Sequence, residues 1–157
     1  FALAQTLMEW GVQPTAVSGH SIGEYVAAVV AGVMPLRAAL EVVLTRARAT
    51  ENLTLPGAML SVGLSGEEAQ SVAERWSGVD VAAVNTDRDS VLAGPEEAIE
   101  DVARELEARG LRHSRLKVVR AFHSWMMQPA AEAVVEKLEG WKDDLKAPMI
   151  PMTSNVT

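Results

Sequence analysis

The sequence contains no cysteine among its 157 residues. This absence excludes disulfide bonds, thiolate catalysis and zinc sites built on cysteine. Histidine is scarce as well: His20, His113 and His123 are the three in the chain, and they lack the spacing of a metal-binding motif. The sequence therefore predicts no metal site.

Positive charge and long apolar runs are also in short supply. Lysine and arginine number 14 against 21 aspartates and glutamates, so the formal net charge at pH 7 is −7. An acidic chain has no broad electrostatic attraction for nucleic acid or for an anionic membrane. The hydrophobic stretches are too short and too interrupted to cross a bilayer. We therefore expect a cytoplasmic protein that binds neither nucleic acid nor membrane.

The composition that remains is that of a globular domain. Hydrophobic residues make up 48% of the chain and charged residues 22%. The length is sufficient for one domain with a hydrophobic core. The chain begins at Phe1 with a helix-like pattern and stops at Thr157 after an extended-looking stretch. We expect it to be a fragment of a larger protein.

Hydrophobic periodicity divides the chain into three parts. Residues 1–55 predict helices near 3–10, 22–31 and 35–49, with a short strand within 12–18. Residues 56–119 predict the order strand, helix, strand, strand, helix, strand, which is the arrangement of a ferredoxin-like unit. Residues 120–157 predict a helix over 125–138 and a buried strand over 149–153. We expect the middle part to be a compact insertion of about 60 residues.

Local signals set the elements of the middle part. Ser65 and Glu68 have the spacing of a capping box before a helix. The last strand is expected to carry Leu116 and Val118 as its inward residues. In the helix over 125–138, the inward face is expected to hold Met127 and, one turn later, Ala131, followed by Val134 and Leu138.

Residues 19–23, "GHSIG", match the nucleophile-elbow pattern, in which a strained strand-to-helix turn exposes a serine hydroxyl. The pattern falls between a predicted strand and a predicted amphipathic helix, and Gly19 and Gly23 are expected to permit a close backbone approach. Ser21 would then lie at a helix N-terminus, where amide dipoles favour developing negative charge. The alternative is that Ser21 is an ordinary helix cap.

A serine hydroxyl is a weak nucleophile until a base takes its proton. His113 lies among basic residues on a predicted strand, which is typical of a surface residue. His20 is adjacent to Ser21, so its side chain is expected to point away. His123, in "VVRAFHSW", lies where the chain leaves a strand and enters a helix, and it is the strongest candidate for the base.

These motifs resemble the acyltransferase domain of modular polyketide synthases and, more distantly, the malonyl-CoA:acyl carrier protein transacylases of fatty-acid synthesis. The resemblance spans essentially the whole chain. It rests on "GHSIGEYVAA" at 19–28, "AFHS" at 121–124, "GAMLSV" at 57–62, "SVLAG" at 90–94 and "SNVT" at 154–157. It implies an α/β fold: an incomplete α/β-hydrolase-like core (1–55 and 120–157) with an inserted ferredoxin-like βαββαβ subdomain (56–119).

The resemblance also implies a chemistry. Ser21 would be acylated from an acyl-CoA thioester and would pass the acyl group to the phosphopantetheine thiol of an acyl carrier protein. His123 would be the general base and later the general acid of a Ser/His dyad. The backbone amide of Ile22 would form part of the oxyanion hole. The implied partners are malonyl-CoA, the carrier protein and neighbouring synthase domains, with no bound cofactor.

By the same resemblance, Arg46 in "VVLTRA" binds the free carboxylate of a malonyl group. A guanidinium can clamp a carboxylate through two parallel hydrogen bonds. Helical geometry supports an inward position: Leu36, Leu40, Val43 and Ala47 form the expected apolar side of their helix, and Arg46 lies at its border.

Substrate choice follows from the residue before the catalytic histidine. In the family, phenylalanine there accompanies malonyl specificity, and the ring of Phe122 would fill the space that a branching methyl group needs. Ile22, where methylmalonyl enzymes often carry glutamine, indicates the same preference. One methyl group is worth only about 1–3 kcal/mol of discrimination, so we expect preference rather than exclusion. His20 and Asn85 are further candidates for lining the substrate site.

The sequence also suggests a docking surface, and it departs from the family pattern at two positions. A local basic surface for an acidic carrier protein is expected near the last strand of the middle part, although basic residues also protect sheet edges from pairing. Position 120 is arginine where many relatives have histidine, and position 125 is tryptophan where many have proline. The residues of the expected basic surface are Arg109, Arg112, Arg115, Lys117 and Arg120.

Two other functions are consistent with parts of the sequence. A serine esterase uses the order serine, acid, histidine, so Asp80, Asp87 or Asp89 would have to orient the base. A non-catalytic docking module would use Ser21 only as a helix cap. An inward arginine clamp has no role in an esterase.

Overall fold

The structure is a computed structural model that describes residues 1–154. The chain forms two compact units, one built from residues 1–48 with the segment from Glu132 onward, the other from Ala49–Ala131. The predicted middle part, 56–119, lies inside the second unit. Of the family-like "SNVT" at the end of the chain, residues 155–157 lie outside the described residues.

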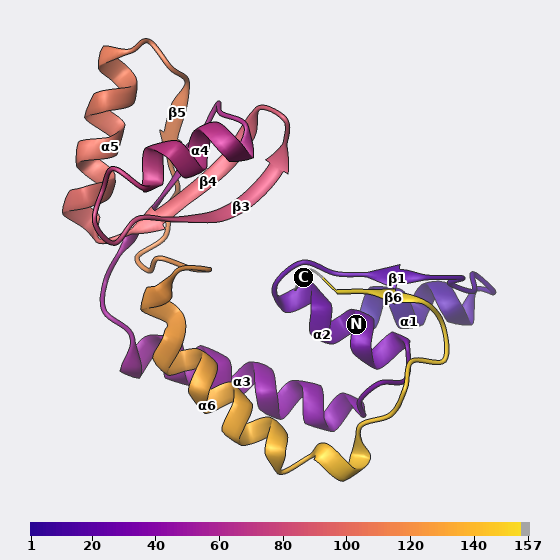
Figure 1. Ribbon diagram of the computed structural model, residues 1–157. Coiled ribbons are helices and arrows are strands. Elements are labelled where there is room, and N and C mark those ends of the chain that lie inside the picture. Colours follow the sequence, from indigo (N-terminus) through magenta and orange to yellow (C-terminus); the bar gives the residue numbers. More distant parts are fainter. Residues whose placement is uncertain (155–157) are drawn as a thin grey trace. The chain divides into compact units, whose positions relative to one another are not determined.

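The first unit contains a small parallel sheet with helices beside it. β1 pairs with β6, and Val17 lies opposite Met152 (Figure 1, β6 in yellow). The elements are α1 (Ala2–Glu9), β1 (Val17–Ser18), α2 (Ile22–Val30), the first part of α3 (Leu36–Leu53), most of α6 (Gln128–Glu139), a short 3₁₀ helix (Lys142–Asp144) and β6 (Met152–Thr153). The predicted helices at 3–10, 22–31 and 35–49 are confirmed as α1, α2 and α3.

Both strands of this sheet are shorter than predicted. Only two residues of each strand pair, and the ladder begins where the Val17 amide donates to the carbonyl of Pro151 at 2.9 Å. Pro14 and Pro151 lack an amide hydrogen and so interrupt a longer ladder. Met149, expected in a buried strand, is 78% exposed.

The buried face of α3 differs from the predicted one. Ala38 and Val42 are fully buried, whereas Leu40 and Leu44 are 61% and 48% exposed. The prediction followed the largest apolar side chains, but the helix packs through its small ones, which allow a close approach. Arg46 lies four residues after Val42 and therefore continues the buried stripe rather than bordering it.

The second unit contains a four-stranded antiparallel sheet with the order β3-β4-β2-β5 (Figure 1). The predicted order of strands and helices is confirmed. The elements are β2 (Ala58–Val62), α4 (Gly66–Ala73), β3 (Asp80–Thr86), β4 (Asp89–Gly94), α5 (Glu96–Ala108), β5 (His113–Arg115) and a 3₁₀ helix (Trp125–Met127).

The two faces of this sheet have separate cores. Alternate residues of β2, such as Leu60 and Val62, pack with α4 and α5 on one face. Met59 points to the other face, which the return segment covers with Ala121 and Met126. The second unit extends to residue 131 because this segment completes its second core.

The last predicted strand is displaced. β5 ends at Arg115, and Leu116 and Val118, expected in the strand, instead pack on the second face of the sheet. The amide of Leu116 donates to the carbonyl of Met59 at 2.9 Å. The alternating apolar residues here thus belong to a segment that covers the second face of the sheet and not to a strand.

Two helix starts in this unit can be compared with the sequence. The predicted capping box is confirmed: Glu68 N donates to Ser65 Oγ at 3.3 Å, and Ser65 N donates to Glu68 Oε2 at 2.8 Å. Near the start of α6, Met126 and Ala130 are buried, one position before the predicted Met127 and Ala131. The 3₁₀ turn over residues 125–127 shifts the helical phase.

Candidate active site

Ser21 lies on a strained turn between β1 and α2, as the elbow pattern predicts. Its backbone has φ 53° and ψ −115°, an uncommon conformation for a residue with a side chain. The turn is closed by two hydrogen bonds, from Gly23 N to the carbonyl of His20 at 2.8 Å and from Glu24 N to that of Ser21 at 3.1 Å. The strand, turn and helix thus hold the serine where the pattern requires it.

The two glycines of the turn are not equivalent. A Cβ atom on Gly19 would lie 2.2 Å from the carbonyl oxygen of Gly23, so no side chain fits there. A Cβ on Gly23 would meet nothing within 4 Å. The expectation that both glycines permit a close approach is right for Gly19 and wrong for Gly23.

Arg46 contacts the candidate nucleophile directly. Its Nη2 donates a hydrogen bond to Ser21 Oγ at 2.8 Å, in a partly buried position. Ser21 occupies the N-cap position of α2, but its side chain makes no capping hydrogen bond to the helix. Because both residues belong to the first unit, this unit alone brings a serine and a guanidinium together.

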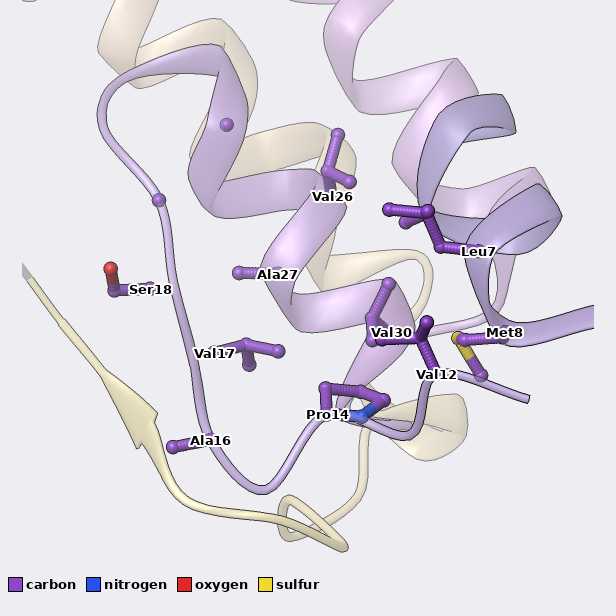
Figure 2. Close-up of a pocket in the computed structure, with 13 residues that line it drawn as sticks. Leu7, Met8, Val12, Pro14, Ala16, Val17, Ser18, Val26, Ala27 and Val30 are labelled. Atoms are coloured by element: carbon purple, nitrogen blue, oxygen red, sulfur yellow. The ribbon is translucent and has the colours of Figure 1, made fainter. Parts of the chain in front are cut away.

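An apolar hollow of about 500 Å³ lies behind the turn, between α1, β1 and α2. Leu7 and Met8 from α1 face Val30 of α2 across it (Figure 2). Ser18 and Gly19 also line the hollow, so it borders the elbow. The hollow has no charged lining residue and suits apolar side chains rather than a charged group.

His123 lies on the second strained turn of the chain. Its φ of 62° makes it, with Ser21, one of the two non-glycine residues with positive φ within residues 1–154. The neighbouring Phe122 is partly buried against the second core of its unit. Both residues that the sequence proposed for serine chemistry therefore have a backbone that costs energy to maintain.

The remaining candidates of the second unit have other contacts. Asn85 lies on the β3–β4 hairpin, where its amide donates to Asp89 Oδ2 at 3.1 Å; Asp89 Oδ1 accepts from Ser61 at 3.1 Å. A ring nitrogen of His113 lies 3.0 Å from the carbonyl of Leu111. The side chains of Asn85 and His113 thus make hydrogen-bond contacts within the second unit.

Two of the acids that an esterase would require have structural contacts. Asp89 is engaged as described, and Asp80 Oδ2 accepts a hydrogen bond from the backbone amide of Trp125 at 2.8 Å. The guanidinium on Ser21 further distinguishes this site from that of an esterase, whose neutral substrates have no use for it.

Two of the five residues of the expected basic surface form ion pairs with glutamates of α5. Arg109 pairs with Glu105 at 2.9 Å, and Arg115 pairs with Glu96, which raises the pKa of the arginine. Arg112 donates to the carbonyl of Arg88 at 3.1 Å. The glutamates of α5 thus neutralise Arg109 and Arg115, which reduces the positive charge of this surface. Its position beside the edge strand β5 agrees with the edge-protection alternative.

Among residues 1–154, no helix is long and apolar enough to span a membrane, and no three histidine, aspartate or glutamate side chains are grouped as metal ligands.

Comparison with known proteins places this arrangement in a family. The model of the "Acyl transferase domain" family matches residues 1–155. The chain is 36% identical over 156 residues to the phenolphthiocerol synthesis polyketide synthase Pks15/1 of Mycobacterium marinum, and 39% identical over 159 residues to the erythronolide synthase EryA2 of Saccharopolyspora erythraea. Each match covers 99% of this chain, but only 7% of the length of Pks15/1 and 4% of the length of EryA2.

Solved structures of acyltransferases are also similar to this chain in fold and sequence. The acyltransferase domain from the second module of the salinomycin polyketide synthase matches with a TM-score of 0.89 at 40% identity, covering 99% of this chain and 37% of that one. An acyl-carrier-protein S-malonyltransferase from Burkholderia pseudomallei matches with a TM-score of 0.90 at 33% identity, covering 99% and 52%.

The α/β fold agrees with these matches, and the chain belongs to the acyl transferase domain family. Within that family it is part of an acyltransferase domain of the modular polyketide synthase type.

Proposed function

We propose that the chain loads a malonyl extender unit from malonyl-CoA, through an acyl-serine, onto the phosphopantetheine thiol of an acyl carrier protein. The observation that carries the proposal is the hydrogen bond of 2.8 Å between Arg46 and Ser21. A guanidinium within contact distance of the nucleophile is suited to hold the free carboxylate of the acyl group. No resident cofactor is needed, because CoA and phosphopantetheine arrive with the substrates.

The first half-reaction assigns a role to each residue. Ser21 Oγ attacks the thioester carbonyl while His123 takes the hydroxyl proton. The C–S bond then breaks, and the imidazolium returns the proton to the departing CoA thiol. The amide of Ile22, at the start of α2, is proposed as one donor to the oxyanion. The second half-reaction reverses these steps with the carrier thiol as acceptor.

Arg46 has two successive partners in this proposal. Without substrate it donates to the neutral hydroxyl of Ser21. A carboxylate is the stronger acceptor, because it brings a full negative charge to the guanidinium and can accept two parallel hydrogen bonds from it. The malonyl carboxylate therefore takes the guanidinium and releases the serine oxygen for attack. A neutral ester supplies no such partner, which is why the esterase alternative is less well supported.

Phe122 and Ile22 are proposed to favour malonyl over methylmalonyl. The packing of Phe122 against the core of its unit supports a fixed ring, and a fixed ring excludes a methyl group better than a mobile one. The expected preference is about 10- to 200-fold. His20, in the elbow itself, stays a candidate for lining the substrate site, whereas Asn85 is better explained by its bond to Asp89.

The proposal includes a fold assignment. The strand–helix order and the sheet order β3-β4-β2-β5 support a ferredoxin-like subdomain. The parallel pair β1–β6 and the elbow support a part of an α/β-hydrolase-like core.

The test is acylation of Ser21 in the full-length protein, followed by mass spectrometry after incubation with malonyl-CoA or acetyl-CoA. We expect one malonyl group on Ser21 and none on Ser21→Ala. Arg46→Ala should lower malonyl loading by at least tenfold more than acetyl loading. Arg48→Ala, on the exposed side of the same helix, is the matched control. Equal losses for the two thioesters would reject the arginine clamp, and a malonyl group on another residue would reject the site.

A further inference from the structure

The turn that carries His123 is fixed on both sides by contacts within the second unit. A non-glycine residue in a left-handed conformation is strained, and the strain persists only when its surroundings over-determine it. The φ of 62° at His123 therefore calls for anchors on each side. The structure supplies them from α3 before the turn and from β3 after it.

Arg120 anchors the incoming side. Its Nε donates to the carbonyl of Thr50 at 3.3 Å, and its Nη2 donates to that of Glu51 at 3.2 Å. These carbonyls belong to the last turn of α3, and that of Thr50 also accepts from the Thr54 hydroxyl at 2.6 Å. Carbonyls at the end of a helix lack the full set of backbone donors, so they are available to a side chain. A cation is also favoured at the negative end of a helix dipole. The guanidinium thus attaches the turn to the end of α3.

The backbone beside Arg120 has no space to shift. Ala121 is fully buried, and a Cβ atom on Gly57 would lie 2.9 Å from the Ala121 methyl group. The amide of Gly57 donates to the carbonyl of Val119 at 3.2 Å. Displacement of this side would break a hydrogen bond and open a packed contact.

Asp80 anchors the outgoing side. Its carboxylate accepts from the backbone amide of Trp125 at 2.8 Å, and the Trp125 indole donates to the carbonyl of Gly78 at 3.0 Å. Ser124 Oγ donates to the carbonyl of Ala121 at 2.6 Å and so closes the turn on itself. The residue after His123 is therefore tied both to the turn and, through Trp125, to the start of β3.

We propose that Arg120 and Asp80 are positioning residues for His123: they fix the two ends of its left-handed turn and so hold the imidazole in one orientation. The inference rests on the proposed function, in which His123 is the base. A misplaced catalytic group loses about a hundredfold in rate for a displacement of about 1 Å. Loosening either anchor should therefore slow acylation without weakening substrate binding.

The experiment compares Asp80→Ala, Asp80→Asn, Arg120→Ala and Arg120→Lys in the full-length protein, with Asp87→Ala in the exposed hairpin turn as the control. Malonyl loading is measured as kcat and KM, and hydrogen exchange is followed in the peptide that contains His123. We expect Asp80→Ala and Arg120→Ala to lower kcat at least tenfold with KM within about twofold of the wild type. Exchange should rise at the turn and stay unchanged in β2.

The conservative variants separate positioning from a general loss of structure. Asp80→Asn keeps an acceptor oxygen, so its kcat should be close to that of the wild type. Arg120→Lys keeps a cation that can donate to one carbonyl, so its kcat should lie between those of the wild type and Arg120→Ala. It should also fold even if Arg120→Ala does not. Unchanged kcat in Asp80→Ala and Arg120→Lys, or a faster-exchanging turn with normal kcat, would overturn the inference. Normal loading by His123→Ala would instead overturn the proposed role of His123, whereas an inactive His123→Ala beside fully active Asp80 and Arg120 variants would overturn the positioning alone.

Discussion

The two units differ in how they are held together. The second unit buries large side chains, including Leu60, Leu92 and Ile99, in one cluster between its sheet and its helices. The buried residues of the first unit are mainly alanines, and it exposes Trp10 and Leu40 by 76% and 61%. The serine and its arginine thus belong to the unit with the smaller core. The strained turn of His123 belongs to the unit with the larger core, whereas the strained turn of Ser21 belongs to the unit with the smaller one.

The sharpest test of this difference is to separate the units. Residues 49–131, expressed alone, should fold and unfold cooperatively in urea, because both faces of their sheet are covered by their own residues. Residues 1–48 alone should show no cooperative transition, since they lack the partner strand of β1. Circular dichroism with urea titration measures both. A non-cooperative transition for 49–131 would remove the basis of the comparison.

A matched pair of leucines should show the same contrast at single-residue scale. Leu60 is 1% exposed in the second unit, and Leu60→Ala should lower the free energy of unfolding by about 2–5 kcal/mol. Leu40 is 61% exposed on α3, and Leu40→Ala should change it by no more than about 0.5 kcal/mol. Urea denaturation of the two variants gives both values. Similar losses would show that Leu40 supports a core of its own.

The same contrast explains where sequence reasoning succeeded. In the second unit, hydrophobic periodicity over residues 56–119 and the Ser65–Glu68 capping box predicted the order of the elements correctly, because each local signal agrees with burial in one core. In α3, the large leucines misled the prediction. A helix that packs through Ala38 and Val42 leaves its leucines outside, and no pattern in the helix itself reports this.

The site shows a similar division. The elbow was predictable from five residues, because a strand, a glycine and a helix constrain one turn. The contact between Arg46 and Ser21 spans 25 positions, and only the family resemblance indicated it. The anchors Arg120 and Asp80 were not identified as such. Their partners are backbone groups at distant positions, and the sequence carries no signal for those.

Within the first unit, the two glycines of the elbow should respond differently. Gly19→Ala places a methyl group 2.2 Å from a backbone oxygen, which cannot move aside as a flexible side chain can. We expect a loss of about 1–3 kcal/mol in the free energy of unfolding, with a parallel loss of Ser21 acylation. Gly23→Ala lies in open space and adds a helix-favouring residue to α2, so it should be neutral or slightly stabilising. If Gly23→Ala were as damaging as Gly19→Ala, the turn would depend on glycine flexibility rather than on the close contact.

The smallest expected effect comes from the helix cap of the second unit. Ser65→Ala removes the acceptor for the Glu68 amide and should cost about 1 kcal/mol. The Ser65 backbone amide, and then its hydroxyl, lower the pKa of Glu68 below its ordinary value of 4.5. A carboxyl whose pKa is lower in the folded state stabilises the protein above its unfolded pKa, and this contribution is lost as the pH falls through the folded pKa. The cost of Ser65→Ala should therefore be full at pH 7 and smaller below pH 4. Urea denaturation at both pH values, with Ser71→Ala on the exposed side of α4 as the comparison, measures the change. A cost independent of pH would show that the Ser65 hydroxyl does not contribute to the lowered pKa of Glu68.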